Sequence, residues 1–402
     1  METLVERSLF EGMAAEQQRE GPPEGFPELP TIPGGRYTDA DFLALEQQFL
    51  WKRSWLYALH TDELPKVGSF RMWRKTGAPI IIIRGKDGRI RAFYNTCRHR
   101  GAPLLEAERG ETKGFFCRYH GWTYDLDGRL LAVREKRDFP GLDTRCMGLA
   151  EVRCELFGNW IFINEDPAAP PLLDSLGPIP KHWEHLDLEG QRHIASASYE
   201  IACNVKILLD AFLETYHLKS IHPQTVDRFL DARGTHVVLW PNGHSLMVTP
   251  HRKAGWRDPG AAGMPEIPTA EEIFAAQNPS YNVFPNLVTP PSATGTPFVV
   301  FWPTTARSMI VDVHWFALEG AQGHELWPTR LSNFERILEE DTQFAPRIQE
   351  SVETAGFKGM YLSYQERRIY HWHEELDRRI GQERVPAALR VKPMLAAYQV
   401  DR

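Results

Sequence analysis

The chain has 402 residues, a hydrophobic content of 42% and a formal net charge of −7 at pH 7. This length predicts two domains, and the acidic balance argues against nucleic acid as a partner. No run approaches the ~20 apolar residues of a membrane helix, so no membrane association is expected. Only five cysteines and a start without signal-peptide features predict a reducing, cytoplasmic compartment.

The first forty residues are expected to form an N-terminal arm. Residues 1–35 are acidic and then rich in Pro and Gly, which predicts little structure of their own. From residue 38 to 55 apolar side chains recur with a helical period, and Thr38 or Asp39 is a plausible N-cap.

A small β domain is predicted over residues 41–165. The run 79–83 has the composition of a buried strand, and Lys86-Asp87-Gly88 is a turn signal leading into a second strand at 90–94. Residues 65–165 as a whole are typical of short strands joined by tight turns.

The remainder, residues 166–402, is predicted to be an α+β domain that follows a Pro-rich linker. Its expected sheet is framed by a helix in mid-chain and by helices near the end of the chain. The ranges expected are helix over 194–222, an irregular excursion over 252–297, strands at 298–302 and 308–316, and helices at 328–355 and 360–380.

Two short motifs in the β domain carry metal-binding side chains. Cys97 and His99 form the first, and Cys117 and His120 form the second, with seventeen residues between His99 and Cys117. Two thiolates and two imidazoles suit a two-iron, two-sulfur cluster with one iron on each ligand pair. Zinc is the alternative. The loops disfavour it because each contains a glycine and aromatic residues and because both lie in a full β domain.

Two further features of this region bear on electron transfer. A hydroxyl from Tyr119 or Tyr124 could bond to sulfur and tune the cluster's potential. Residues 98–137 hold nine Lys or Arg against six Asp or Glu. This local excess of positive charge predicts a docking face for an acidic electron donor, although ordinary surface variation also accounts for it.

A second candidate site lies in mid-chain. On a helix, Asp210, Glu214 and His217 would share one face, and His222 follows where Pro223 predicts a helix end. Two histidines and one carboxylate suit non-haem Fe(II) with open positions for O₂. Three neighbouring residues, Glu339, Glu340 and Asp341, are candidates for the missing carboxylate, and composition does not choose among them.

Together these motifs resemble those of the catalytic α subunits of Rieske non-haem iron oxygenases. The Cys-x-His and Cys-x-x-His pair followed by Gly-Trp is similar to the Rieske signature, and Glu-x-Tyr-His-x-x-x-x-His is similar to the family's iron motif. The resemblance implies an α+β fold, with an N-terminal all-β Rieske domain and a C-terminal helix-grip (START-like) catalytic domain of antiparallel sheet and helices.

The resemblance also implies roles for single residues. It implies that Cys97, His99, Cys117 and His120 bind the [2Fe-2S] cluster. His217 and His222 would bind mononuclear Fe(II), with Asp341 as the preferred third ligand because its surroundings look like the family's ligand helix.

The resemblance implies roles for three more residues. Glu214 lies where the family places a carboxylate that links the iron site to the Rieske histidine, here His120, of a neighbouring subunit. Most members have Asp there, and Glu is typical of those resembling quaternary-ammonium monooxygenases. Asp210 and Asn204 match upstream positions that orient ligands and line the electron path.

The implied function is an oxygenase component that hydroxylates a small organic substrate with O₂. Electrons would come from NAD(P)H through a separate reductase or ferredoxin, and transfer between chains implies a homotrimer. An aromatic substrate is expected first; a quaternary-amine or betaine-type monooxygenase, or an N- or O-demethylase, is the alternative. A Rieske electron-transfer protein without oxygenase activity is the rival from another class.

Overall fold

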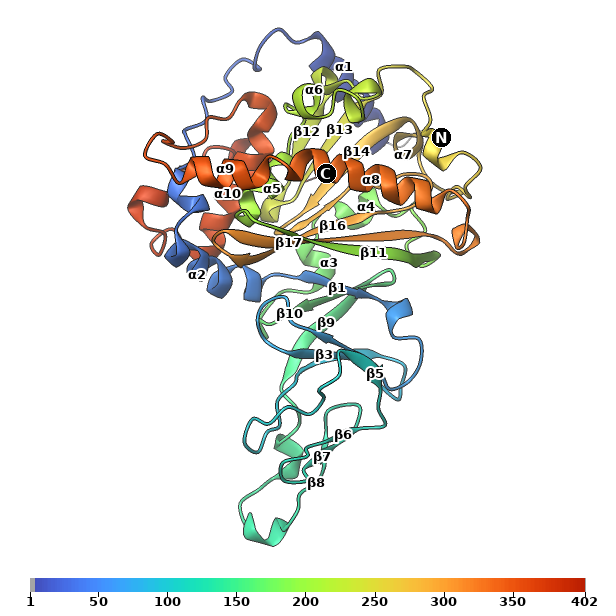
Figure 1. The fold of residues 1–402 in the computed structure, drawn as a ribbon, viewed down its shortest axis with the longest axis vertical. Coiled ribbons are helices and arrows are strands. Elements are labelled where there is room, and N and C mark those ends of the chain that lie inside the picture. The colour runs from blue at the N-terminus through green and yellow to red at the C-terminus, as the bar shows by residue number, and fades with distance from the viewer. Residues whose placement is uncertain (1–3, 402) are drawn as a thin grey trace. The chain divides into compact units, whose positions relative to one another are not determined.

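The computed structural model describes residues 4–401, and Figure 1 shows its elements. The chain divides into two compact units. One unit is Trp51–Leu172, and the other combines the segment up to Leu50 with everything from Leu173 onwards. Residues 4–50 therefore group with the part of the chain from Leu173 onwards and do not form a separate arm.

The unit Trp51–Leu172 is built from antiparallel strands. A seven-stranded sheet has the order β1-β10-β9-β4-β3-β2-β5, and a smaller sheet has the order β6-β7-β8. The bounds are β1 Leu56–His60, β2 Ser69–Trp73, β3 Ile80–Arg84, β4 Ile90–Tyr94, β5 Arg109–Glu111, β6 Phe115–Phe116, β7 Thr123–Tyr124, β8 Leu130–Ala132, β9 Glu151–Phe157 and β10 Trp160–Asn164.

The core of this unit explains where its two Cys-His loops lie. The isoleucines of β3 are fully buried between β2 and β4, as a continuous apolar run predicts. Cys97 and Cys117 belong to the same apolar cluster as Phe93 and Trp122. The cysteine side chains of both loops are thus packed into the core of the unit Trp51–Leu172.

The other unit contains a second seven-stranded antiparallel sheet, in the order β11-β17-β16-β15-β14-β13-β12. Its strands are β11 Gln191–Ile201, β12 His236–Leu239, β13 Ser245–Pro250, β14 Gln277–Val283, β15 Leu287–Thr289, β16 Phe298–Thr305 and β17 Ser308–Leu318. The strands predicted at 298–302 and 308–316 correspond to β16 and β17. This sheet with its helices agrees with the predicted α+β class.

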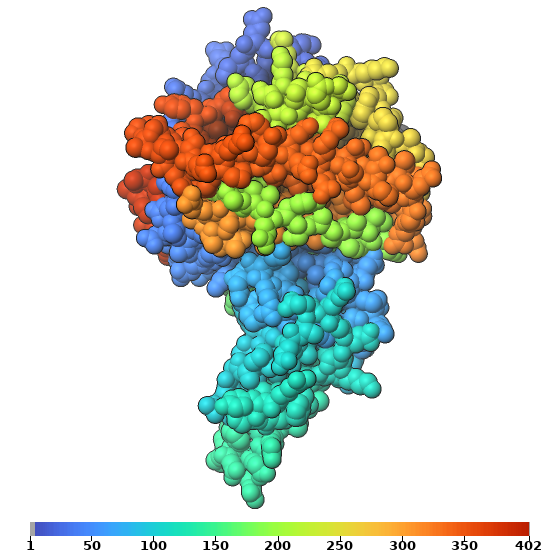
Figure 2. Space-filling view, viewed as in Figure 1, coloured from blue at the N-terminus to red at the C-terminus, as the bar shows by residue number. Residues whose placement is uncertain are grey.

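Helices precede this sheet, lie between its strands and follow it in the sequence, and α3 begins at Leu172, the last residue of the other unit. They are α1 Leu4–Gln18, α2 Ala40–Phe49, α3 Leu172–Ser175, α4 Ile179–His182, α5 Val205–Ala211, α6 Leu218–Ile221, α7 Glu272–Ala276, α8 Trp327–Thr342, α9 Ala345–Val352 and α10 Arg367–Ile380. In Figure 2 the orange segment of α8 and α9 covers one face of this unit. Among residues 4–401, no helix combines the length and apolar character needed to cross a bilayer.

The expectation that residues 1–35 have little structure is wrong for Leu4–Gln18, and residues 1–3 lie outside the described part of the chain. Leu4–Gln18 forms helix α1, which buries Leu9 and Met13. Arg36 and Tyr37 are also buried, at 1% and 0% exposure. Asp39 is the N-cap of α2, as predicted, and its carboxylate accepts the N–H groups of residues 41 and 42.

Two other ranges differ from the sequence prediction. Residues 191–201 form strand β11 and not the start of a helix, because they pair with β17 along the whole strand, and Ser198 also donates to Asp312. Within 252–297 the chain forms α7, β14 and β15 and contributes two strands to the sheet. The predicted helix over 328–355 is divided into α8 and α9 at Gln343 and Phe344.

Candidate functional site

The two Cys-His loops fold in the same way. In each loop the cysteine carbonyl accepts the N–H of the glycine four residues on, at 2.9 Å for Gly101 and 2.8 Å for Gly121. Both glycines have positive φ values, of 74° and 76°, which glycine adopts without strain. The matching turns bring the His99 and His120 rings to a centroid distance of 4.5 Å.

The atoms presented by these loops fit an iron–sulfur cluster. Cys97 and Cys117 are free thiols, 2% and 1% exposed. The Nδ1 atoms of His99 and His120 are buried and have no hydrogen-bond partner within residues 4–401. Buried imidazole nitrogens without partners are costly unless a ligand uses them. Two buried nitrogens and two buried thiols are the donor set that the cluster requires.

Tyr124 supports the first loop. Its hydroxyl lies 3.3 Å from the Cys97 sulfur and accepts the N–H of Arg98 at 3.1 Å. Burial, and then the contact with the Cys97 thiol, raises the pKa of Tyr124. Of the two tyrosines considered from the sequence, Tyr124 therefore contacts sulfur, whereas Tyr119 is 58% exposed and lies against His120.

A second set of donors meets in the other unit. Atoms of His217, His222 and Asp341 lie within 4.8 Å of one another. Asp341 Oδ1 is 3.5 Å from His217 Nε2 and 3.0 Å from His222 Nε2. Among the three carboxylates left open by the sequence, Asp341 is the one that faces both histidines.

The histidines are presented by a break in the chain and not by one continuous helix. Helix α5 ends at Ala211, and α6 begins after His217. The Glu214 carboxylate accepts the backbone N–H groups of Tyr216 and His217, which stabilises the turn between the two helices. His222 then ends α6, as its spacing and Pro223 predicted.

Both iron-site histidines have their second ring nitrogen held by a carboxylate. His217 Nδ1 lies 2.5 Å from Glu214 Oε1, and His222 Nδ1 lies 2.7 Å from Glu340 Oε2. Because each Nδ1–H donates outwards, each Nε2 keeps its lone pair for a metal. This orienting role of Glu340 was missed from the sequence, where it was only a candidate ligand.

The electrostatics of this site favour a cation. Burial lowers the pKa of His217 and His222, but the neighbouring carboxylates outweigh burial and raise it. The carboxylates concerned belong to Glu214, Glu340 and Asp341. Two oriented imidazoles and an adjacent aspartate fit a divalent metal of the non-haem Fe(II) type.

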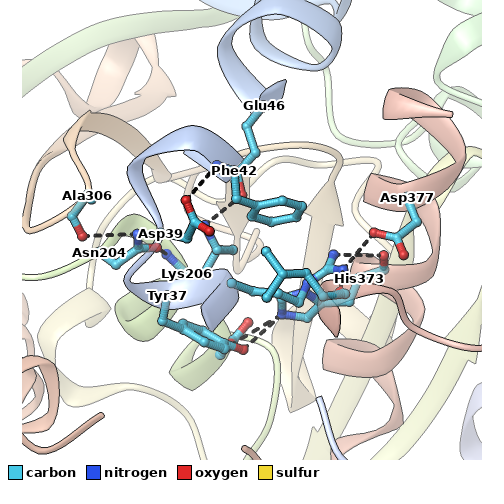
Figure 3. Close-up of polar contacts among 12 residues, drawn as sticks. Tyr37, Asp39, Phe42, Glu46, Asn204, Lys206, Ala306, His373 and Asp377 are labelled. Carbon is cyan, nitrogen blue, oxygen red and sulfur yellow. Dashed lines mark hydrogen bonds and ion pairs between the residues drawn. The ribbon is translucent and has the colours of Figure 1, made fainter. Parts of the chain in front are cut away.

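Asn204 and Asp210 do not reach the His217–His222–Asp341 cluster. Asn204 caps α5, with its side chain accepting the N–H of Lys206 at 3.1 Å and donating to the Ala306 carbonyl at 3.1 Å (Figure 3). Asp210 is buried, and its Oδ2 accepts a hydrogen bond from Tyr37. Burial raises the pKa of Asp210 to about 7.

A cavity of about 670 Å³ adjoins the second set of donors. Its lining includes His217, His222 and Asp341 at one place and the helix α8 side chains Phe334 and Ile337 beside them. A cavity of this size can enclose a small organic molecule. The cluster of donors thus opens onto space for a substrate.

Comparisons with known proteins agree with this geometry. A family model for the Rieske [2Fe-2S] domain matches residues 54–145, and one for the catalytic domain of the ring hydroxylating alpha subunit matches residues 188–382. The predicted combination of domains is therefore confirmed.

Curated relatives are oxygenase components of two kinds. The glycine betaine monooxygenase oxygenase subunit of Pseudomonas aeruginosa is 31% identical over 201 residues, 50% of this chain and 47% of that protein. The large oxygenase component of the naphthalene 1,2-dioxygenase system of Pseudomonas putida is 33% identical over 225 residues, 52% of this chain and 49% of that protein. The chain thus spans about half the length of the curated relatives it matches.

Solved structures share the fold over more of the chain. A quaternary ammonium Rieske monooxygenase studied for carnitine oxidation has a TM-score of 0.75 at 21% identity, covering 90% of this chain and 99% of that one. Naphthalene 1,2-dioxygenase from Rhodococcus sp. has a TM-score of 0.76 at 21% identity, covering 96% and 100%. These similarities support the fold and leave the substrate open.

Proposed function

We propose that this chain, which belongs to the Rieske oxygenase alpha subunits, is the oxygenase component of a multicomponent system that hydroxylates a small organic substrate with O₂. One observation carries the proposal. The chain holds two separate donor sets, the Cys-His loops in one unit and the His217–His222–Asp341 cluster in the other, and the latter opens onto a cavity.

The first donor set would hold the [2Fe-2S] cluster through Cys97, His99, Cys117 and His120. The two thiolates would bind one iron, and the Nδ1 atoms of the two histidines would bind the other. Trp122 stacks on His99 at a centroid distance of 5.1 Å and an angle of 10°, which fixes the orientation of that imidazole.

The second donor set would hold the mononuclear iron through His217, His222 and Asp341. When bound, the two iron groups would supply one-electron transfer and O₂ activation. The chain's own contribution is orientation: Glu214 and Glu340 hold the two imidazoles so that both Nε2 atoms point at the metal position. The cavity walls would hold the substrate beside that position and exclude water from it.

Electrons would pass between neighbouring copies of the chain. Glu214 already contacts a proposed iron ligand, His217, and its side chain is 8% exposed at the cavity. A hydrogen bond donated by the imidazole N–H of His120 in a neighbouring copy to the Glu214 carboxylate would link the two kinds of centre. Such head-to-tail pairing closes into a ring, and a homotrimer is the expected assembly.

A separate reductase or ferredoxin would supply the electrons from NAD(P)H. The surface around the Cys-His loops exposes Arg98, Arg100 and Arg118, together with the apolar side chains of Phe116 and Tyr119. A basic surface with exposed aromatic groups suits transient docking of an acidic electron carrier.

Two classes of substrate are compatible with this site. An aromatic substrate is the first expectation, and a quaternary amine is the alternative, since the relatives include enzymes of both kinds. Aromatic side chains of the cavity, including the stacked pair Phe229 and Trp256, suit either a ring or a cation.

The deciding experiment combines iron content with oxygen incorporation. Purified protein should contain about three irons per chain, and about two in a variant with both His217 and His222 replaced by alanine. With a reductase and ¹⁸O₂, the wild type should form labelled product and the double variant should not. Two irons in the wild type, with rapid electron transfer and no labelled product, would instead identify an electron carrier.

A further inference from the structure

We propose that the cavity binds an elongated organic anion, with its carboxylate on Arg330 and its oxidised carbon near Asp341. The inference rests on the proposed function, because it treats this cavity as the substrate site. It adds a substrate class that the relatives' names leave open.

The helix α8 sets the length of the site. Arg330, Phe334, Ile337 and Asp341 line the cavity, and their spacings of four, three and four residues place them on one helix face. Eleven residues correspond to about 16 Å along the axis. All side chains of a helix tilt towards its N-terminus, so the side chains of Arg330 and Asp341 are separated along the axis by about the same distance as their backbones.

The Arg330 guanidinium is held in place by its surroundings. Its Nη1 donates to Thr294 Oγ1 at 2.9 Å and lies 3.1 Å from the Met264 sulfur. The guanidinium carbon lies 5.8 Å from the ring centroid of Trp315 and 5.3 Å from that of Trp327. These contacts fix the orientation of the group before any ligand arrives.

The opposite edge of the same guanidinium has no partner. Within residues 4–401, Nε and Nη2 of Arg330 make no hydrogen bond and no carboxylate lies within 4.0 Å. Burial lowers the pKa of Arg330 more than the charge of Asp258 raises it, so the cation is poorly compensated. The Nε–Nη2 edge is the part of arginine that binds a carboxylate with two parallel hydrogen bonds.

The other cationic side chains of the cavity are less suited to this role. Arg257 is paired with Glu272 at 3.0 Å, and Arg336 is exposed. Between Arg330 and the metal-binding residues, Phe334 and Ile337 of α8 line the cavity together with Asn333 and Arg336. An anion bound at Arg330 therefore needs a long body, packed on Phe334 and Ile337, to reach the metal position, and a molecule the size of benzoate or glycine betaine does not have it.

Binding to the purified, iron-loaded protein without reductant tests this inference separately from turnover. The probes are biphenyl-4-carboxylate, its neutral carboxamide, benzoate and glycine betaine, measured by calorimetry. The wild type should bind the biphenyl carboxylate at least about tenfold more tightly than any other probe, because charge-assisted hydrogen bonds are stronger than neutral ones. Equal or tighter binding of the carboxamide or of glycine betaine would overturn the proposal without any variant.

Variants then assign the effect to Arg330. Arg330→Met should weaken binding of the carboxylate roughly 10- to 100-fold and leave the carboxamide within about threefold. The affinity of Arg330→Lys for the carboxylate should lie between those of the wild type and Arg330→Met, since lysine keeps the charge but cannot form two parallel hydrogen bonds. Arg347→Met, an equal charge change on an exposed residue of α9, should bind as the wild type does. Unchanged carboxylate affinity in folded Arg330→Met would contradict the inference.

Different results would refute the anion site and the oxygenase activity. If carboxylate binding depends on Arg330 but no labelled oxygen is incorporated from ¹⁸O₂ with any probe, the proposed oxygenase activity is wrong and the anion site stands. If a neutral or cationic substrate is hydroxylated and Arg330→Met does not alter its KM, the anion site is wrong and the oxygenase stands.

Discussion

The hydroxyl of Tyr37 donates a 2.7 Å hydrogen bond to Asp210, a residue 173 positions away in the sequence. The same hydroxyl lies 2.9 Å from His373 Nε2. Because Arg36 Nε donates to His373 Nδ1 at 3.0 Å, the proton of that imidazole must be on Nε2, and it donates to Tyr37. A directed chain of hydrogen bonds thus runs from Arg36 to Asp210, in part visible in Figure 3.

Replacing Tyr37 by phenylalanine should destabilise this unit by about 1 to 3 kcal/mol. The change removes the donor to Asp210 and leaves the buried N–H of His373 without an acceptor, and unsatisfied buried groups are costly. The urea dependence of tryptophan fluorescence would measure the loss. Tyr361→Phe, at a residue 84% exposed, is the matched control and should change stability by less than about 0.5 kcal/mol.

The raised pKa of Asp210 predicts a specific pH dependence of stability. Burial raises this pKa from 3.8 to about 7. The unfolded chain loses the proton near pH 4 whereas the folded chain keeps it, so the free energy of unfolding falls as the pH rises from about 4 to about 7.

Asp210→Asn removes this titration and keeps an acceptor for Tyr37. Relative to the wild type, the variant should gain about 2 to 3 kcal/mol in free energy of unfolding between pH 5 and pH 8, because only the wild type loses stability over this range. Denaturant titrations at the two pH values measure it. Asp174→Asn, at an exposed carboxylate, should give a constant difference, and a constant difference for Asp210→Asn as well would show that its pKa is not raised.

The local motifs could be predicted from the sequence because their ligands are fixed by short loops. Cys97 and His99 are two residues apart, so one turn positions both, and the same holds within the second loop. The partners Glu340 and Tyr37 could not be predicted in their roles. Each role depends on which face of a distant element contacts the site, and that is decided by packing between segments more than a hundred residues apart in the sequence.

The errors in the predicted helix over 194–222 have a local and a distant cause. Residues up to Ile201 pair with β17, and this tertiary pairing outweighs their helical propensity. The break between α5 and α6 arises because the Glu214 carboxylate binds backbone N–H groups of the next turn. A helical period in the sequence does not reveal such a competing hydrogen bond.

Removing the Glu340 carboxylate should weaken the mononuclear iron site. Glu340→Ala leaves His222 Nδ1 without its partner, and loss of such a partner typically lowers metal affinity 10- to 100-fold. Competition between the protein and a chelator for Fe(II) measures this affinity. Glu339→Ala changes the neighbouring, exposed carboxylate and should retain wild-type affinity; equal losses in both variants would assign the effect to charge alone.

Tyr124→Phe should lower the reduction potential of the proposed cluster. The hydroxyl lies 3.3 Å from the Cys97 sulfur, and a hydrogen bond to sulfur stabilises the reduced, more negative state. Loss of about 1 kcal/mol corresponds to roughly 40 mV for one electron. A spectroscopic redox titration would detect the shift. Tyr119→Phe, on the exposed ring beside His120, should leave the potential within about 10 mV of wild type.

Glu214→Gln separates electron transfer from iron binding. The amide oxygen can still accept the His217 Nδ1–H, so both metals should remain bound and the cluster spectrum should be unchanged. Turnover driven by the reductase should fall more than about tenfold. Product formation driven by hydrogen peroxide in place of O₂ and reductase should keep its wild-type yield, because peroxide supplies both the oxygen atoms and the two electrons and no electron must then cross between copies. A variant that turns over normally with the reductase would refute the bridging role, and one that also loses the peroxide-driven reaction would place Glu214 in the iron site itself.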